Sequence, residues 1–197
     1  TLTHLRGQGY SVVDIELPSV SFALATYYIL NFAEVSSNLS RLDGVRYGLA
    51  KEGDSLFGDY AQSRGAGFGP ETRRRIILGT YVLSAGYYDA YYGKANQARA
   101  QLTQEFTHTL EQVDYIATPT MPTPAFTIGE KSDPLSMYVA DIFTVTANLT
   151  GNPALSVPCG VVERGGKQLP VGIQVTAAHG HEAALFAIGA DIERVRA

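Results

Sequence analysis

Charged side chains stand beside apolar runs at two places in the sequence. Three consecutive arginines, residues 73–75, lead into the apolar stretch "IIL", and Asp141 stands inside "YVADIFT". Successive helical residues point about 100° apart, so the arginines cannot share one role, and Arg75, next to the apolar stretch, is the best candidate to face inward. A guanidinium binds a carboxylate bidentately, and a carboxylate binds an ammonium. Arg75 and Asp141 therefore suit a zwitterionic amino acid, with a solvated helix face or a structural ion pair as the alternatives.

A very polar segment follows a helix that looks buried. Tyr27 and Tyr28 lie in the apolar stretch "FALATYYILNFAEV", where tyrosines usually belong to the core. The segment "SSNLSRLDGVRYG", residues 36–48, comes directly afterwards. It is either a loop whose side chains satisfy backbone groups or one wall of a site for a polar ligand.

No nucleophile with an adjacent base stands out in the sequence. There is no G-x-S-x-G motif, and no phosphate-binding or dinucleotide-binding fingerprint follows any strand. Cys159, in the apolar stretch "SVPCG", reads as a core residue. His179 and His181 form an H-x-H pair, but no clustered Cys, Asp or Glu completes a set of metal ligands, so a solvated loop is favoured over a metal site. His108 is expected on the surface of a long helix.

The elements that must position these residues alternate between helices and short apolar strands. This alternation predicts an α/β fold with a mixed sheet covered by helices on both faces. Residues 154–162 and 170–177 flank the turn "ERGGKQ" and predict a hairpin. The expected helices span 20–35, 54–64 (capped by Asp54), 69–84, 87–112, 133–151 (from an Asp cap to Gly151) and 181–196, and the expected strands span 10–18, the start of 115–126, 154–162 and 170–177.

Composition excludes several classes of protein. The 197 residues, 45% hydrophobic and 17% charged, suit one globular domain, residues 1–197. The net charge of −4 gives no support for nucleic-acid binding, and the single cysteine excludes an internal disulfide. No apolar run approaches the roughly 20 residues of a membrane span, so a cytoplasmic setting is the default. Because the chain opens on Thr1 at what reads as the end of a helix, we expect it to be a fragment or a cleaved product.

Three long motifs carry a resemblance to a known family. These are "SSNLSRLDGVRYG", "RRRIILGTYVLSAGYYDAYY" and "DPLSMYVADIFTVTANLTGNPALSVPCG". Together they resemble the amidase signature family, and most closely its A subunits of the amidotransferases that act on glutamyl-tRNA(Gln) and aspartyl-tRNA(Asn). The resemblance covers only the C-terminal part of that family's length. It implies the C-terminal portion of an amidase signature fold.

The resemblance also implies amide hydrolysis by a Ser–cis-Ser–Lys triad. No "GGSSGG"-like segment occurs in this sequence, and none of its lysines (Lys51, Lys94, Lys131 and Lys167) lies in the expected context. We therefore assign no catalytic residue and expect the triad upstream of Thr1. On this interpretation the chain alone is inactive.

The substrate-binding residues of the family fall within this chain. The resemblance implies that glutamine is bound by Tyr27, Arg75 and Asp141, with Tyr28 as the alternative to Tyr27. It also places residues 36–48 beside the active site, with Ser37, Asn38 and Arg41 ordering that segment rather than reacting. The implied partners are a B subunit, which would hold ATP, magnesium and most of the tRNA contacts, and a small C subunit; no cofactor or metal is expected on this chain.

Two other functions stay open. A stand-alone amidase of the same superfamily would hydrolyse simple amides, which need neither charge of the Arg75 and Asp141 pair. A non-catalytic truncation or interaction module would keep the fold without the triad. Binding of a partner subunit without hydrolysis of glutamine would favour the module.

Overall fold

The computed structural model describes residues 1–194, and its contacts divide the chain into two compact units. The first unit comprises Thr1–Leu24 with Ala98–Ala197, and the second comprises Ala25–Gln97. The single domain expected over residues 1–197 stays a prediction. Of the helix expected over 181–196, the last two residues lie outside the described part of the chain.

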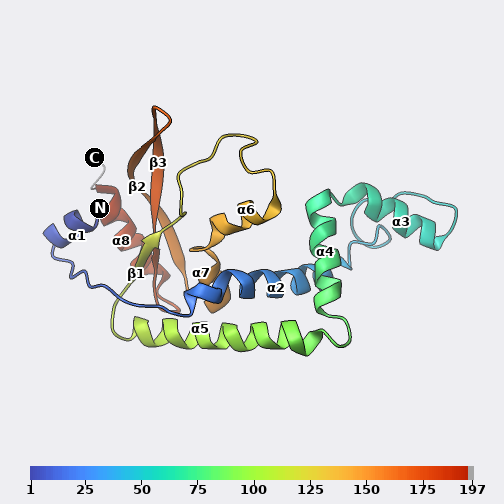
Figure 1. The fold of residues 1–197 in the computed structure, drawn as a ribbon, viewed down its shortest axis with the longest axis horizontal. Helices are drawn as coiled ribbons and strands as arrows, with labels where there is room; N and C mark the ends of the chain where they lie inside the picture. Colours follow the sequence, from blue (N-terminus) through green and yellow to red (C-terminus); the bar gives the residue numbers. More distant parts are fainter. Residues whose placement is uncertain (195–197) are drawn as a thin grey trace. The chain divides into compact units, whose positions relative to one another are not determined.

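Helices account for most of both units, and the only strands among residues 1–194 belong to the first (Figure 1). The helix α2, Val20–Leu39, begins in the first unit and continues in the second, and α5, Lys94–Leu110, runs in the opposite order. The other elements of the second unit are α3 (Leu56–Gly67), α4 (Pro70–Val82) and the π-helix η1 (Tyr88–Gly93). Those of the first unit are α1 (Leu2–Gly7), β1 (Ile116–Pro119), α6 (Pro134–Tyr138), the 3-10 helix η2 (Val139–Asp141), α7 (Val145–Thr150), β2 (Ala154–Arg164), β3 (Lys167–Thr176) and α8 (Glu182–Arg194).

The sheet of the first unit has the strand order β1-β3-β2, and each described pair of strands is antiparallel. The expected hairpin is confirmed as β2 and β3. Its turn contains Gly165 and Gly166, with φ angles of 59° and 73° that favour glycine. The α/β class is confirmed, whereas the mixed pairing expected of the sheet is not seen among the three strands in residues 1–194.

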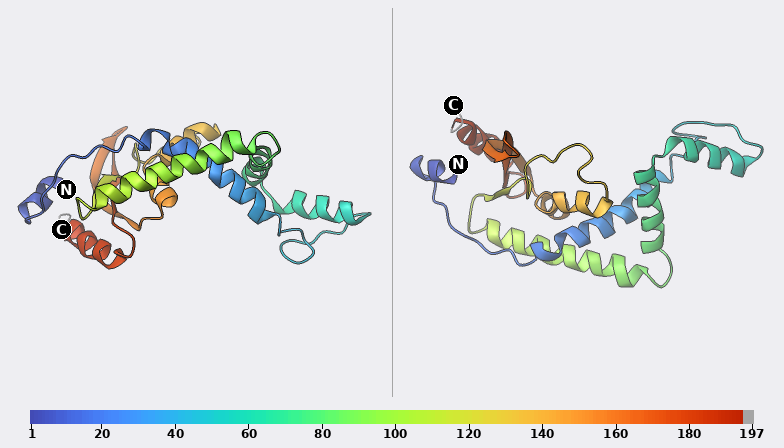
Figure 2. Two further views of the ribbon diagram at one scale, coloured as in Figure 1. Left: turned by 90° about the horizontal axis from the view of Figure 1, so that it is seen from below. Right: turned by 45° about the horizontal axis from the view of Figure 1, so that its top comes forward.

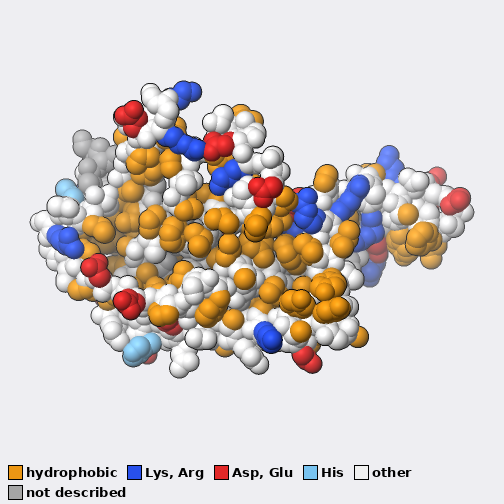
Figure 3. Space-filling model, in the orientation of Figure 1, with side chains coloured by type: hydrophobic (Ala, Val, Ile, Leu, Met, Phe, Trp, Pro, Cys, Tyr) orange, Lys and Arg blue, Asp and Glu red, His pale blue; other side chains and the backbone are white. Residues whose placement is uncertain are grey.

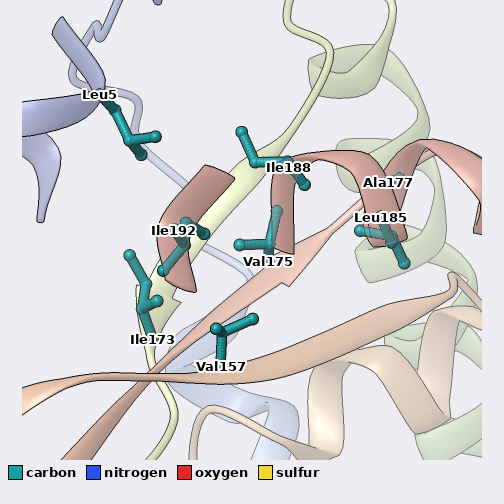
Figure 4. Close-up of a cluster of buried hydrophobic side chains, with 8 residues drawn as sticks. All are labelled: Leu5, Val157, Ile173, Val175, Ala177, Leu185, Ile188 and Ile192. Atoms are coloured by element: carbon teal, nitrogen blue, oxygen red, sulfur yellow. The ribbon is translucent and has the colours of Figure 1, made fainter. Parts of the chain in front are cut away.

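One face of this sheet forms the main hydrophobic core. Val157 of β2 and Ile173 and Val175 of β3 pack with residues from α8, and Figure 4 shows these side chains converging. The hairpin and α8 lie side by side in Figures 1 and 2. Cys159 packs against the edge of the cluster, as expected of a core cysteine. The remaining members of the cluster are Leu5, Ala177, Leu185, Ile188 and Ile192.

The strand expected over residues 10–18 is wrong. This segment has no strand pairing, and Val13 is 60% exposed. Tyr10 anchors its start to α8 by donating a hydrogen bond of 2.6 Å to Asp191. Alternating apolar residues favour an extended chain, but a strand also needs a neighbouring backbone to pair with, and residues 1–194 supply none at this position.

The single helix expected over 133–151 is broken into three pieces. The expected ends are correct: Asp133 accepts a hydrogen bond of 2.9 Å from the Ser136 N–H, Pro134 opens α6, and Gly151 ends α7 with a φ of 76°. Between η2 and α7 the chain forms a turn over 142–144. The long helix expected over 87–112 likewise begins with the π-helix η1 before α5.

In the second unit, α2 and α4 approach very closely. A Cβ atom added at Gly79 of α4 would lie 1.9 Å from the Phe32 carbonyl oxygen and 2.5 Å from the Ser36 Cβ. One residue further along, the Thr80 and Ser36 hydroxyls are 3.1 Å apart and share a hydrogen bond. The cap of α3 is Ser55 rather than the expected Asp54, because the Ser55 hydroxyl accepts the Gly58 N–H.

Hydrophobic side chains cover much of the surface drawn in Figure 3. They include side chains that are more than half exposed, such as Phe57, Ile77, Leu135 and Phe186. Apolar surface of this kind is typical of faces that contact other protein. Within residues 1–194, no helix is both long enough and apolar enough to span a membrane.

We expect Gly79→Ala to destabilise the packing of α2 against α4. Because the added methyl group meets backbone atoms, which cannot turn aside, the cost should reach about 1–3 kcal/mol. The measurement is the midpoint of chemical denaturation. Gly65→Ala in α3 is the matched control, since nothing lies within 4 Å of its added Cβ; that change should instead stabilise by about 0.4–1 kcal/mol. Equal effects of the two changes would contradict the close approach at Gly79.

Candidate functional site

The polar segment that follows the apolar part of α2 mostly satisfies its own backbone. The helix α2 runs on to Leu39, so the first residues of the segment are helical. Arg41 donates two hydrogen bonds of 3.0 Å to Asn38, one to its carbonyl and one to its side-chain oxygen. The Ser40 hydroxyl donates to the Ser37 carbonyl at 2.6 Å. Asn38 and Arg41 therefore order the chain as expected, whereas Ser37 contributes a backbone carbonyl.

The next turn of this segment is held by a carboxylate and a guanidinium. Asp43 accepts the backbone N–H groups of Val45 and Arg46 at 2.9 and 3.1 Å, and these bonds lower the pKa of its carboxyl group. Arg64 of α3 donates at 3.1 Å to the carbonyl of Leu39, the last residue of α2. The C-terminal carbonyls of a helix lack partners within the helix, so Arg64 meets a need that every helix end has.

Tyr27 and Tyr28 have different surroundings on α2. Tyr28 is 8% exposed and packs against Phe32, with ring centroids 5.6 Å apart. Tyr27 is half-buried and meets the Tyr28 ring edge-on, with centroids 5.2 Å apart. Of the two, Tyr27 is the residue whose side chain has surface left for a ligand.

The three arginines of α4 point in different directions, as the helical period predicts. Arg73 donates to the carbonyl of Gly65 in α3, and Arg74 donates to Glu71. Arg75 donates its Nε–H to the other oxygen of Glu71 at 2.9 Å, one helical turn away. At 31% its side chain is less exposed than that of Arg74 at 42%, which confirms Arg75 as the arginine that faces inward.

Asp141 is half-buried at the end of η2, not deep in the apolar middle of a long helix as expected. Its carbonyl accepts the backbone N–H and the hydroxyl of Thr144 at 2.9 and 3.1 Å. Two residues later, the Phe143 carbonyl accepts the side-chain N–H of Gln174 at 3.0 Å. The backbone on the C-terminal side of Asp141 is therefore fixed by hydrogen bonds from both its own turn and the sheet.

The structure places the three predicted substrate-binding residues in two units. Tyr27 and Arg75 belong to the second unit, and Asp141 belongs to the first. Sequence reasoning missed the contact of Glu71 with Arg75, although their spacing of four residues is the usual signal of a helical ion pair. It also missed Gln174, for which no local signal exists because its partner lies 31 residues away.

The histidines and the cysteine add no catalytic group in residues 1–194. His108 lies on α5 with its side chain 72% exposed, as expected, and contacts Glu111 at 3.3 Å. The Nε2 atom of His179 lies 3.1 Å from the Thr150 carbonyl at the end of α7. Within this part of the chain, no group of three or more His, Cys, Asp or Glu side chains could hold a metal ion.

Comparison with known proteins identifies the family. The chain matches the family model described as Amidase over residues 1–186. The chain belongs to the amidase family. The expected resemblance is thereby confirmed, and it extends over nearly all of this amidase chain.

Two curated relatives show how much of a longer protein the amidase chain matches. It is 54% identical over 198 residues to the A subunit of the glutamyl-tRNA(Gln) amidotransferase from Acidobacterium capsulatum, covering 100% of this chain and 41% of that protein. It is 51% identical over 192 residues to the protein of the same name from Chloroflexus aggregans, covering 97% of this chain and 38% of that protein. The chain thus spans about two-fifths of the length of these relatives.

Solved structures share the fold of the amidase chain. In the crystal structure of the Thermotoga maritima glutamyl-tRNA(Gln) amidotransferase, the A subunit is 40% identical, with a TM-score of 0.61 over 89% of this chain and 32% of that one. A 6-aminohexanoate cyclic dimer hydrolase is 16% identical with a TM-score of 0.65, over 98% of this chain and 39% of that one, which shows the fold alone. The predicted amidase signature fold, as a portion of a larger domain, is confirmed.

We expect Asp133→Ala to weaken α6, which leads into η2 and Asp141. Hydrogen bonds from Ser136 lower the pKa of the Asp133 carboxyl group below its ordinary 3.8. The cap is therefore fully present above about pH 3.8 and is lost as the pH falls through the lower folded-state value. Thermal unfolding between pH 7 and pH 3 measures this. Asp133→Asn, whose oxygen also accepts the Ser136 N–H, should keep the cap and flatten the pH dependence; a parallel decline in both proteins would contradict the assignment.

Proposed function

We propose that this chain is the substrate-binding part of the glutamine-hydrolysing A subunit of a tRNA-dependent amidotransferase, which converts glutamyl-tRNA(Gln) to glutaminyl-tRNA(Gln) with ammonia taken from glutamine. The observation that carries the proposal is the 54% identity over the whole chain to a protein named for that subunit. Identity at this level far exceeds the 16–18% shared with amide hydrolases such as the cyclic dimer hydrolase, where the likeness is one of fold.

Arg75 and Asp141 supply the two charges that free glutamine requires. We assign the α-carboxylate of glutamine to the Arg75 guanidinium, which can donate two parallel N–H bonds to it. Glu71 holds the Arg75 Nε–H at 2.9 Å, so the remaining guanidinium N–H groups are oriented before substrate arrives. We assign the α-ammonium to the Asp141 carboxylate and a further hydrogen bond to the Tyr27 hydroxyl. A simple amide carries neither charge, so this pair favours glutamine over the substrates of a stand-alone amidase.

The chemical step, on this proposal, belongs to a part of the subunit outside residues 1–197. The sequence has no Gly/Ser-rich segment with paired serines, and no nucleophile with an adjacent base occurs in residues 1–194. Residues 1–197 alone should therefore not release ammonia from glutamine. We further propose a cytoplasmic assembly in which a B subunit carries ATP, magnesium and most tRNA contacts and a small C subunit joins the pair, with no cofactor on this chain.

The same chain offers a direct test through a chimera. Residues 1–197 would replace the matching 41% of the Acidobacterium capsulatum relative, and ammonia release from glutamine would be compared between the chimera and residues 1–197 alone. Activity in the chimera only is the expected result. A chimera that folds and binds partner subunits without releasing ammonia would favour the non-catalytic alternative.

We expect Arg75→Ala in the chimera to raise KM for glutamine about 30-fold or more, because a charge-assisted pair of this kind is worth about 2 kcal/mol or more. The readout is steady-state ammonia release. Arg74→Ala is the matched control, since Arg74 is adjacent on α4, also contacts Glu71 and is more exposed; its KM should stay close to that of the unchanged chimera. An unchanged KM for Arg75→Ala would remove Arg75 from the site.

We expect Asp141→Asn to raise KM for glutamine in the same way and to spare a neutral primary amide. The amide side chain preserves shape but loses the charge that attracts an ammonium. Comparing kcat/KM for the two substrates measures the effect. An equal loss for both substrates would show that Asp141 does not bind the ammonium, and a neutral amide that outcompetes glutamine in the unchanged chimera would favour a stand-alone amidase.

A further inference from the structure

The two faces of the sheet differ sharply in character. Side chains alternate between the faces of a strand, so Ile173 and Val175 of β3 point into the core with α8 while Gln174 points to the opposite face. Gln174 lies directly opposite Thr118 of β1 and Ser156 of β2 in the strand register. This second face is polar, and the middle strand places Gln174 at its centre.

Gln174 is buried, which makes its hydrogen bonding consequential. The residue is 5% exposed, and its Nε2 donates to the Phe143 carbonyl at 3.0 Å. A buried amide without a partner is costly, so this bond is strongly favoured once the sheet has formed. The hydroxyl of Thr118 on the same face is also buried, but it has no hydrogen-bond partner within the described chain. The polar face therefore holds the 142–144 turn through Gln174 and not through Thr118.

The contact of Gln174 falls at the break between two short helices. Phe143 belongs to the 142–144 turn, and its carbonyl also accepts the Thr146 hydroxyl at 2.9 Å. Asp141 lies two residues before it and ends η2, a helix of one turn that has little rigidity of its own. The bond to Gln174 ties this short stretch to the hydrogen-bonded sheet.

We propose that Gln174 is a positioning residue that, by donating its amide N–H to the Phe143 carbonyl, fixes the turn that presents the Asp141 carboxylate to substrate. This inference rests on the proposed function, because it concerns the side chain assigned there to the ammonium of glutamine. Gln174 itself touches no reacting atom; it acts through the backbone of residues 141–144.

The substitution Gln174→Met in the chimera tests the proposal. Methionine preserves volume and length but removes the donor. Thr118→Val is the matched control, since it removes a polar atom from the same face that makes no hydrogen bond within residues 1–194. We expect Gln174→Met to raise KM for glutamine roughly tenfold, the effect of losing one buried hydrogen bond, and to leave kcat nearly unchanged. Its kcat/KM for a neutral primary amide, and both constants for Thr118→Val, should stay within about twofold.

A second readout separates this inference from the proposed function. Hydrogen–deuterium exchange of peptides covering residues 139–146 should be faster in Gln174→Met and unchanged in Thr118→Val. Faster exchange in Gln174→Met, with no effect of Asp141→Asn on KM, would sustain the positioning of the turn and reject the role of Asp141 in the proposed function.

Two outcomes would overturn the inference. The first is unchanged exchange and unchanged KM in a folded Gln174→Met protein. The second is an equal loss toward glutamine and the neutral amide accompanied by a lower unfolding temperature, which would reduce Gln174 to a stabilising residue. The substitution Gln174→Glu adds a check: its ionised carboxylate faces a carbonyl and should impair glutamine binding at pH 8, with recovery at lower pH as the side chain regains a proton to donate.

Discussion

The central place of β3 in the sheet is the constraint on which the first unit depends. Its residues are paired on both sides, with Thr118 and Ser156 flanking Gln174 in register. This pairing sends Ile173 and Val175 into the core with α8 and Gln174 to the face that holds the 142–144 turn. Because side chains alternate, a slip of one residue would exchange the two faces and lose the core and the turn together. The stability of this unit and the placement of Asp141 therefore have a common origin.

The second unit is organised by close backbone approach and by polar contacts. Gly79 lets α4 meet the backbone of α2 at Phe32, where a larger residue has no room. The end of α2 then presents carbonyls that Arg64 and Arg41 satisfy. A polar segment next to a buried helix is thus explained by the needs of the helix end.

Each charged residue assigned to substrate is supported by a residue that does not bind substrate itself. Glu71 accepts the Nε–H of Arg75 from one helical turn away, and Gln174 acts on the turn after Asp141 from a distant strand. Such supporting contacts fix a side chain before a ligand arrives, so less conformational freedom is lost on binding. The two contacts differ in kind, because one lies within a helix and the other links separate elements.

Sequence patterns alone were enough to predict the family, the hairpin, most helices, the caps at Asp133 and Gly151, and the inward direction of Arg75. These features depend on local period, turn chemistry and helix-end preferences, all of which act over a few residues. The folded chain was needed to establish that residues 10–18 stay unpaired, that the helix expected over 133–151 breaks before Val145, and that Gln174 reaches Phe143. Strand pairing and a hydrogen bond across 31 residues depend on which backbone lies alongside, and no local pattern encodes that neighbour.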